Sequence, residues 1–557
     1  MWLIWAYFLA STVYLPGTNA PTVARNGMVV SANSIASEVG IETLKKGGTA
    51  IDAAVATAFA LAVTHPTAGN IGGGGFLVYR PNEGDPIAYD FRETAPAAAH
   101  PDMWLVDGKY SYEKHHLSHC SVGVPGTVAG LYLAWQDHGK LPWKDLVEPA
   151  ILLAEDGIVV THHLAESLKG ALPRMEKYFA STAKFTRQGV PFEAGDLWQQ
   201  PQLAYTLRRI AALGPDGFYK GRTAELIVSE MEANDGLITM EDLANYQAKK
   251  RKPVFGDYRG YKIISMPPPS SGGITLIEML NILEFYPIQG YGNGSANTLH
   301  IMTESMRRAY RDRAQYLGDV DFNPDMPVDR LLSKQHASQL RSNIRLDMAF
   351  KSDPSDISLA KESLETTHFS IVDQDRNAVA LTYTLEYGYG SGIVVPGGGF
   401  LLNNEMGDFN AAPGLTDEHG QIGTTPNLAE PGKRMLSSMT PTIVEQEGEL
   451  FMVTGTPGGR TIINTVLQTI LNVIDHGMNA QSAVDAGRIH HQWLPDQLIY
   501  EKYGVSPDTL EKLSSLGHQL AEKENQGAAE VIVFKQEEDQ LEGGLDRRSP
   551  DGGIGTW

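Results

Sequence analysis

The sequence predicts a layered α/β or α+β sandwich, in which helices cover a strand-rich centre. Residues 143–346 are mostly helical in pattern, whereas strand-like segments dominate after Ser352. The 57 glycines and 31 prolines indicate many turns rather than long bundles or solenoids. The length of 557 residues allows three or four domains, or one large unit with a sizeable core.

The first 20 residues differ from the rest of the chain. Residues 2–15 are almost wholly apolar, Pro16 and Gly17 end the run, and small residues follow. This pattern predicts a secretory signal and a periplasmic or secreted protein, although no Lys or Arg precedes Arg25. A poorly ordered leader or a wrongly assigned start is the alternative. The run is too short for a membrane anchor, which needs about 20 apolar residues.

Two helices and a hairpin are expected next. Apolar spacing predicts a helix over residues 34–44, and the Ala-rich run 51–63 predicts a buried one. Residues 76–79 and 87–91 read as the two strands of a hairpin. The four glycines at 72–75 precede a strand, so they indicate a close backbone approach rather than a phosphate-binding loop.

The last third predicts mainly strands. The expected strands are residues 368–373, 378–384, 399–402, 442–445 and 450–454. One clear helix, residues 462–474, should end at Gly477. The Pro- and Ser-rich stretch 266–273 reads as a turn-rich joint without a functional role.

Composition excludes several functions. The formal charge of −21 argues against a nucleic-acid partner and disfavours binding to anionic lipid. The single cysteine, Cys120, cannot form an intramolecular disulfide and has no clear activating group. The adjacent His pairs lack a matching set of ligands, so no metal is expected.

A threonine-rich hairpin is the first candidate site. Residues 365–373 and 378–384 flank a polar turn. If Asp373 pairs with Ala378, Thr367 lies opposite Thr384 and three threonines gather at one end. Because Thr–Thr pairs are common in strands, the same pattern can be purely structural.

Other segments could complete an acyl-transfer site. Glycines at 455–459 run into a helix, where their N–H groups can face an oxyanion. Arg92 ends a strand and could bind a carboxylate in bidentate fashion, or form a surface ion pair. Polar loops supply Ser437 and Ser438, and a cluster that ends in Asp408.

These segments together resemble the signature blocks of the γ-glutamyltransferases. The blocks are residues 70–75, 90–92, 122–127, 366–370, 402–409, 434–441 and 455–459, and the match runs in order from about Met28 to the end. The resemblance implies an N-terminal-nucleophile hydrolase with a four-layer αββα sandwich. Such a precursor cuts itself between Glu365 and Thr366, giving a large subunit of residues 21–365 and a small subunit of 366–557 without a covalent link.

Cleavage would create the catalytic base. Within the chain Thr366 has a hydroxyl but no nearby base. Once freed, its α-amine has an ordinary pKa of roughly 7.7–8 and can accept the proton of its own hydroxyl.

The family mechanism implies roles for ten residues. Catalysis would use Thr366 as nucleophile, Thr384 as its support, and Gly458 and Gly459 as the oxyanion hole. Arg92, Ser437 and Ser438 would bind the α-carboxylate of the substrate, while Asp408, Glu405 and Glu386 would bind its α-ammonium. The donor would be glutathione or a related γ-glutamyl compound, and the acceptor water, an amino acid or a dipeptide. No cofactor is implied.

Several positions depart from the family pattern. Glu386 stands where many members carry Asn and others carry Glu, and Gly407 stands where a second acid often precedes the Asp. Residues 409–434 have the length of the family's lid, with His419 where some members place an aromatic hydroxyl residue. The alternative is a passive surface loop. Two other functions stay open: another amidase of this architecture, such as a cephalosporin acylase, or an uncleaved amino-acid-binding protein.

Overall fold

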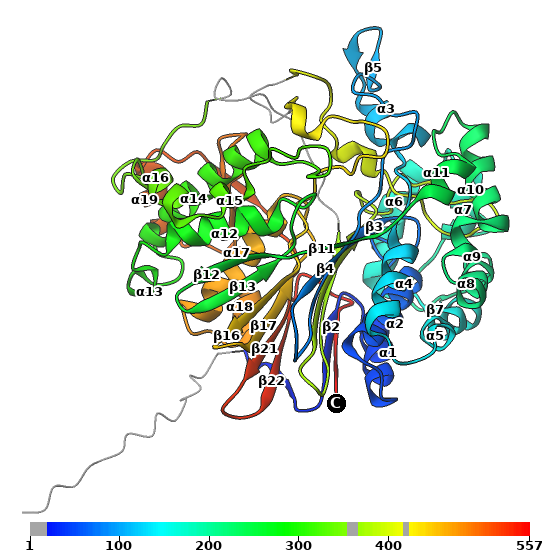
Figure 1. Cartoon of the computed structure of the whole chain (residues 1–557), viewed down its shortest axis with the longest axis horizontal. Coiled ribbons are helices and arrows are strands. Elements are labelled where there is room, and N and C mark those ends of the chain that lie inside the picture. Colours follow the sequence, from blue (N-terminus) through cyan, green and yellow to red (C-terminus); the bar gives the residue numbers. More distant parts are fainter. Residues whose placement is uncertain (1–18, 354–365, 416–422) are drawn as a thin grey trace, which may run out of the picture.

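Two seven-stranded antiparallel sheets pack face to face, and helices cover the outer surface of each (Figure 1). The computed structural model describes residues 19–353, 366–415 and 423–557. The layers confirm the αββα sandwich that the family resemblance implies, so the length forms one large unit rather than three or four domains. Nearly all of the predicted leader lies outside the described residues. Within them, no helix is both long and apolar enough to cross a membrane.

The first sheet carries the threonine hairpin near its centre. Its strand order is β11 (Lys249–Arg251), β4 (Ile87–Phe91), β3 (Gly74–Arg80), β15 (Ala378–Thr384), β14 (Thr367–Val372), β2 (Met28–Ser31) and β23 (Gly553–Thr556). The central strands are buried along their whole length. Segments from both sides of residue 366 therefore alternate within one sheet.

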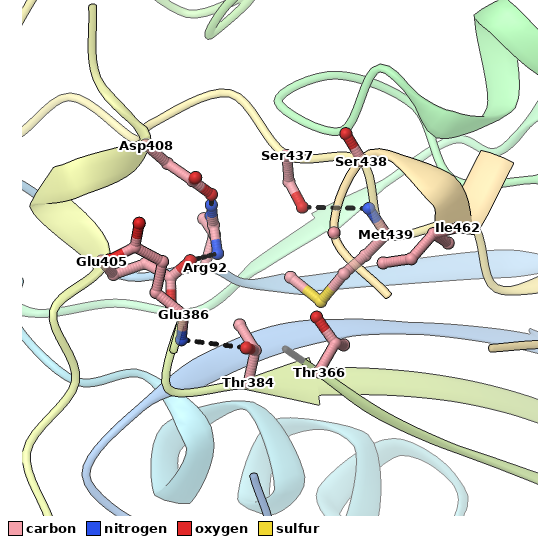
Figure 2. A pocket seen from close by; sticks show the side chains of 11 residues that line it. Arg92, Thr366, Thr384, Glu386, Glu405, Asp408, Ser437, Ser438, Met439 and Ile462 are labelled. Atoms are coloured by element: carbon pink, nitrogen blue, oxygen red, sulfur yellow. Dashed lines mark hydrogen bonds and ion pairs between the residues drawn. The ribbon is translucent and has the colours of Figure 1, made fainter. Parts of the chain in front are cut away.

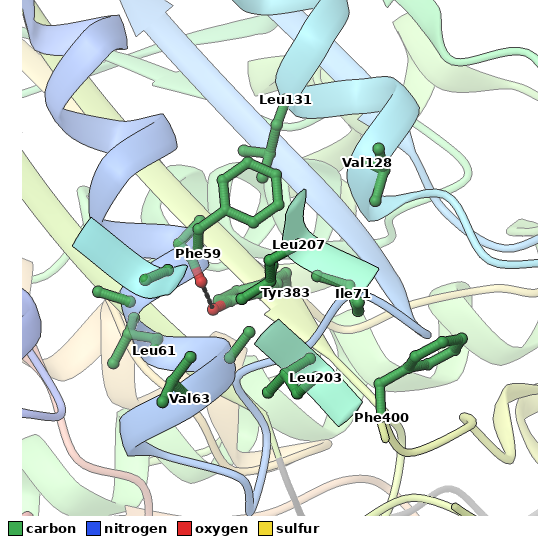
Figure 3. Packing of buried hydrophobic residues seen from close by; sticks show 14 of the residues in the cluster. Phe59, Leu61, Val63, Ile71, Val128, Leu131, Leu203, Leu207, Tyr383 and Phe400 are labelled. Atoms are coloured by element: carbon green, nitrogen blue, oxygen red, sulfur yellow. Dashed lines mark hydrogen bonds between the residues drawn. The ribbon is translucent and has the colours of Figure 1, made fainter. Parts of the chain in front are cut away.

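Helix α2 (Ala50–Thr64) fixes this sheet from outside. It is buried along its entire length and packs against α1 (Ser34–Lys45), α4 (Thr127–His138), α5 (Trp143–Asp156) and the sheet. A helix enclosed on all sides must be apolar all round, which explains its Ala-rich sequence. Figure 3 shows this core, where the Tyr383 hydroxyl of β15 donates to the Ala58 carbonyl of α2 at 3.0 Å.

The second sheet builds the other half of the sandwich. Its order is β1 (Thr22–Ala24), β22 (Gln540–Leu545), β21 (Glu530–Lys535), β17 (Glu449–Gly455), β16 (Thr442–Gln446), β13 (Tyr261–Ser265) and β12 (Val254–Tyr258). Helices α12 (Gly272–Leu283), α17 (Thr461–Ile474) and α18 (Ala480–Asp485) cover it. Between the two sheets lies an apolar cluster that includes Phe76, Ala380 and Val453.

The register of the threonine hairpin differs from the prediction by one residue. Val372, not Asp373, pairs with Ala378, and Thr367 pairs with Tyr383. The Asp373 N–H donates to the Asn377 carbonyl at 3.1 Å, and the Asp373 carboxylate accepts the Asn377 N–H at 2.9 Å. This closes a three-residue loop, in which Arg376 has φ +64°. Thr366, which directly precedes the first pair, is thereby aligned with Thr384.

The other predicted elements are largely confirmed. Helices α1, α2 and α17 and the β3–β4 hairpin lie where expected. The strand at 399–402 is wrong: only an isolated bridge joins Leu401 to Val394, because Gly397 and Gly399 adopt positive φ and turn the chain. Two further helices after residue 352, α18 and α19 (Pro507–Ser515), were not predicted.

Candidate active site

A pocket at the end of the first sheet gathers most of the predicted site residues. It is lined by Arg92, Thr366, Thr384, Glu386, Glu405, Asp408, Ser437, Ser438, Met439, Gly459 and Ile462 (Figure 2). Of the predicted residues, Gly458 lines an adjoining cavity, and Glu365 lies outside the described residues. Met439 and Ile462 were not predicted, because apolar residues beside a loop carry no chemical signal in the sequence.

Thr384 is held in place by its own loop. Its Oγ1 accepts the Glu386 N–H at 2.9 Å (Figure 2), and its carbonyl accepts Nδ2 of Asn70 at 2.9 Å. Asn70 also accepts the Gly73 N–H at 3.0 Å. A Cβ at residue 73 would lie 2.1 Å from the Thr384 carbonyl oxygen, which confirms the close backbone approach predicted for the glycine run. Asn70 is a positioning residue that the site prediction missed.

The glycine turn before α17 presents free backbone donors. Gly458 and Gly459 have φ of +129° and +55°, and the Gly458 carbonyl accepts the Thr461 N–H at 3.1 Å. Among the described residues, neither the Gly458 N–H nor the Gly459 N–H donates to another group. Donors at a helix N-terminus favour negative charge, so this turn can stabilise an oxyanion beside Thr366.

Arg92 is the electrostatic centre of the pocket. Directly after β4, its fully buried guanidinium forms ion pairs with Glu405 and Asp408. It also donates to the carbonyls of Met435 at 3.3 Å and Leu436 at 3.2 Å. The alternative of a surface ion pair is therefore wrong. The structure brings together the residues predicted to bind the two charges of an amino acid.

Burial shifts the pKa values of the acids around Arg92. Burial raises the pKa of Glu405 to about 8, although the Arg92 charge opposes this shift. Burial likewise raises the pKa of Glu93 to about 7. Burial lowers the pKa of Arg92, but the nearby Glu405 and Asp408 charges outweigh it, and the net shift is upward. Glu93 lies 3.7 Å from Arg92 and was missed, since its sequence position next to Arg92 gives no sign of its burial.

The loop of Ser437 and Ser438 is braced by residues distant in sequence. Ser437 Oγ accepts the Met439 N–H at 3.1 Å, and Ser438 Oγ accepts from Arg313 at 3.0 Å. The N–H of Ser271 donates to the Ser437 carbonyl at 2.8 Å. The stretch 266–273, read from the sequence as a joint without function, thus supports the site.

The carboxylate of Glu386 lies directly beside Gly407. Glu386 is buried with φ +78°, and its Oε1 lies 3.3 Å from Nδ1 of His116. A Cβ at residue 407 would lie 2.3 Å from that His116 nitrogen and 2.7 Å from Glu386 Oε1. An acidic side chain at position 407 would therefore collide with the Glu386 carboxylate and repel it.

The segment predicted as a lid is fixed at both described ends. Nδ2 of Asn410 donates to the Thr424 carbonyl at 2.6 Å, and Nδ2 of Asn427 donates to the Asp408 carbonyl at 2.7 Å. Its middle, with His419, lies outside the described residues, so a covering role stays a prediction.

One group of potential metal ligands exists among the described residues, away from the pocket. Glu278, Asp312 and His336 place their ligand atoms within 4.8 Å of one another, on α12, α14 (Ala296–Tyr316) and α16 (Lys334–Arg341). His336 Nε2 already lies 2.6 Å from Asp312 Oδ2. None of the three lines the pocket.

Comparison with known proteins gives consistent matches. The family model described as gamma-glutamyltranspeptidase matches residues 36–556. The chain is 48% identical over 540 residues to the glutathione hydrolase proenzyme of Escherichia coli (strain K12), covering 95% of this chain and 92% of that protein. Cephalosporin acylase from Bacillus halodurans has a TM-score of 0.85 at 29% identity and covers 99% of both chains. Helicobacter pylori gamma-glutamyltranspeptidase is 47% identical with a TM-score of 0.56, over 57% of this chain and 91% of that chain.

Proposed function

The chain belongs to the gamma-glutamyltranspeptidase family and is an enzyme, and we propose that it cleaves the γ-glutamyl amide of glutathione and related compounds. The acyl group passes to water or to the amine of an amino acid or peptide. The observation that carries the proposal is the pocket in which Thr366, a glycine turn, one buried arginine and three carboxylates meet.

Thr366 is proposed as the nucleophile. Its Oγ attacks the γ-carbonyl, and its own α-amine accepts the hydroxyl proton. The oxyanion that forms is stabilised by the N–H groups of Gly458 and Gly459. Collapse breaks the amide bond, and the leaving amine takes the proton from the Thr366 ammonium. Water, or an acceptor amine, then attacks the γ-glutamyl ester by the same steps and frees Thr366.

The ion pairs of Arg92 suggest how the amino acid head is bound. The Arg92 guanidinium is already paired with Glu405 and Asp408, so a ligand that binds it must displace side-chain contacts already present. A substrate α-carboxylate can replace Asp408 and Glu405 on Arg92, and its α-ammonium can in turn pair with those acids. Opposite charges therefore exchange partners without leaving a buried charge alone. Ser437, Ser438 and Glu386 would complete this recognition.

The catalytic amine requires cleavage before Thr366. We propose that the precursor cuts itself there, producing subunits of residues 21–365 and 366–557. The leader predicted in residues 1–20 would direct the protein to the periplasm or outside the cell.

Gel electrophoresis tests the processing. Purified protein should give two bands, with Thr366 at the N-terminus of the smaller and a residue near 21 at that of the larger. Thr366→Ala should remain one band and release no glutamate from glutathione. A wild-type protein that stays in one full-length band after long incubation would contradict self-processing.

The likeness to a cephalosporin acylase supports a second candidate, another amidase on the same fold. The Arg92 cluster favours the first, because a substrate without an amino acid head would not need both charges. Turnover of an N-acyl β-lactam amine in preference to glutathione would favour the second.

A further inference from the structure

Three helices on the outer side of the second sheet bring two carboxylates and an imidazole together (Figure 1). Glu278 belongs to α12, Asp312 to α14 and His336 to α16, and each offers one ligand atom within 4.8 Å of the other two. All three residues are buried. His336 is not part of the adjacent His pairs on which the sequence expectation of no metal rested, so that expectation does not bear on this cluster.

Glu278 is the residue that packing alone leaves unexplained. It is only 1% exposed, and its Oε1 has no hydrogen-bond partner among the described residues. It lies within α12, whose residues are buried from end to end. A buried carboxylate without a hydrogen-bond partner is costly, and the nearby Asp312 carboxylate adds repulsion. A cation between the two carboxylates would remove both costs.

Asp312 is already oriented in the way that metal ligands usually are. Its Oδ1 accepts from the Arg311 guanidinium at 3.0 Å, while its Oδ2 lies 2.6 Å from Nε2 of His336. One carboxylate oxygen is therefore fixed from outside the cluster and the other faces into it, and such outer support orients metal ligands. The charges of Arg311 and Arg330 also act on Glu278, but neither arginine satisfies its Oε1.

We propose that Glu278, Asp312 and His336 bind a divalent transition-metal ion, with zinc as the first candidate. Two carboxylates balance the charge of the ion, and the imidazole nitrogen favours zinc over magnesium or calcium, which prefer oxygen ligands. Ligand atoms that lie about 2.0–2.2 Å from one zinc ion are about 3–4 Å apart, so side-chain shifts of about 1 Å complete the site. The ion takes the place of the Nε2 proton of His336, which moves to Nδ1.

The ion would act as a structural cross-link between the three helices. Two of these helices also brace the serine loop of the pocket. Arg313 of α14 donates to Ser438 Oγ at 3.0 Å, and Ser271, directly before α12, donates its N–H to the Ser437 carbonyl at 2.8 Å. A ligand that binds only the folded state stabilises that state. Because none of the three metal ligands lines the pocket, the ion takes no part in the proposed reaction.

Calorimetric titration of the purified, chelator-treated enzyme with zinc tests the site. The wild type should bind one zinc ion with a Kd of about 1 μM or below. Glu278→Gln and His336→Gln should each weaken this binding at least about a hundredfold, since loss of an outer-shell partner alone costs about ten- to a hundredfold. His162→Gln removes a histidine from an exposed adjacent pair and should bind zinc as the wild type does. Magnesium should not bind at the site.

Thermal unfolding separates metal binding from a purely structural role of these residues. At a zinc concentration of about 100 times Kd, the thermal midpoint of the wild type should rise by about 2 °C, whereas that of Glu278→Gln should move by less than about 0.5 °C. Without zinc, Glu278→Gln should unfold no earlier than the wild type, because the amide carries no buried charge. His336→Gln repeats the test on another helix if Glu278→Gln does not fold.

Crystals of the zinc-loaded enzyme locate the ion directly. Anomalous scattering at the zinc edge should place it between the three side chains, about 2.0–2.2 Å from each ligand atom. A wild type that binds no zinc, or that responds equally to magnesium, would overturn the proposal. Equal zinc binding by the wild type and by both variants would assign the ion to surface histidines and would overturn it as well.

Discussion

At the level of single residues, burial is the main constraint on the charged side chains of the pocket. Arg92 is enclosed completely, with acids on one side and backbone carbonyls on the other. A planar guanidinium can serve both sets at once, whereas an ammonium cannot. This difference makes the charge-conserving substitution informative.

Arg92→Lys should raise KM for glutathione by roughly ten- to a hundredfold, because a lysine loses the forked contact with a carboxylate. The thermal midpoint of unfolding should fall only modestly, since the positive charge is retained. Arg80→Lys is a suitable control: this buried arginine pairs with Glu445 at 2.9 Å and does not line the pocket. Unchanged glutathione kinetics in Arg92→Lys would contradict the proposed head-group site.

Glu93 should make folding stability depend on pH. Its folded pKa of about 7 exceeds the unfolded value of about 4.3, so the native state binds more protons between these values. The free energy of unfolding should therefore fall as pH rises through this window, by up to about 1.4 kcal/mol per pH unit for this group. Glu93→Gln should reduce the slope.

Urea unfolding between pH 5 and 7, in an uncleaved Thr366→Ala background, measures this dependence on a single chain. Glu405 has a raised pKa of about 8 and adds a slope of the same sign. The exposed Glu83→Gln control should leave the slope unchanged. A slope as steep in Glu93→Gln as in the parent would show that Glu93 is not the titrating group.

At the level of elements, two turns decide the geometry. The Asp373 loop sets which threonine faces Thr384, and the Gly458–Gly459 turn sets the donors at the start of α17. Both depend on backbone conformations that the strand and helix patterns do not encode.

Asp373→Ala should destabilise the protein by about 1–3 kcal/mol, because it leaves backbone donors without their acceptor. The carboxylate accepts N–H groups from Asn377 and, at 2.9 Å, from Ala50 at the start of α2. Looser register should also slow cleavage before Thr366, which a time course on gels would follow. Asp375→Ala, at an exposed neighbouring position, is the matched control. Equal behaviour of the two variants would contradict the role of Asp373.

Gly458→Ala should reduce kcat by at least about a hundredfold, the loss typical of a disturbed oxyanion donor. A Cβ there would lie 2.5 Å from Thr461 Oγ1, at a φ that side chains rarely adopt. Gly477→Ala introduces backbone strain at φ +62° in open space and should leave kcat unchanged. A normal kcat in Gly458→Ala would remove this turn from the mechanism.

At the level of the whole molecule, the two proposed subunits are interleaved. β14 pairs with β2 on one side and with β15 on the other, while β2 also pairs with β23. One sheet thus alternates strands from before and after residue 366, and its faces lie in shared cores. Separation of the subunits would expose these cores to water.

The cleaved subunits should therefore elute together in size-exclusion chromatography without denaturant and separate on a denaturing gel even without reductant. The second result follows because Cys120 is the only cysteine in the sequence. The uncleaved Thr366→Ala variant should elute at the same volume as the cleaved protein. Dissociation under native conditions would contradict an interleaved fold.

The sequence alone indicated which residues form the site and that helices and strands form a layered fold. Helical and alternating periodicities located α1, α2, α17 and most of the central strands, and ordered motif blocks indicated the site residues, because these signals are local. Only the tertiary structure decided the hairpin register, the burial of Arg92 and Glu93, and the bracing of the serine loop by Ser271 and Arg313. Each of these features depends on contacts between segments far apart in the chain. The charge at a site is likewise set by which charged side chains meet there, and not by the net charge of the whole chain.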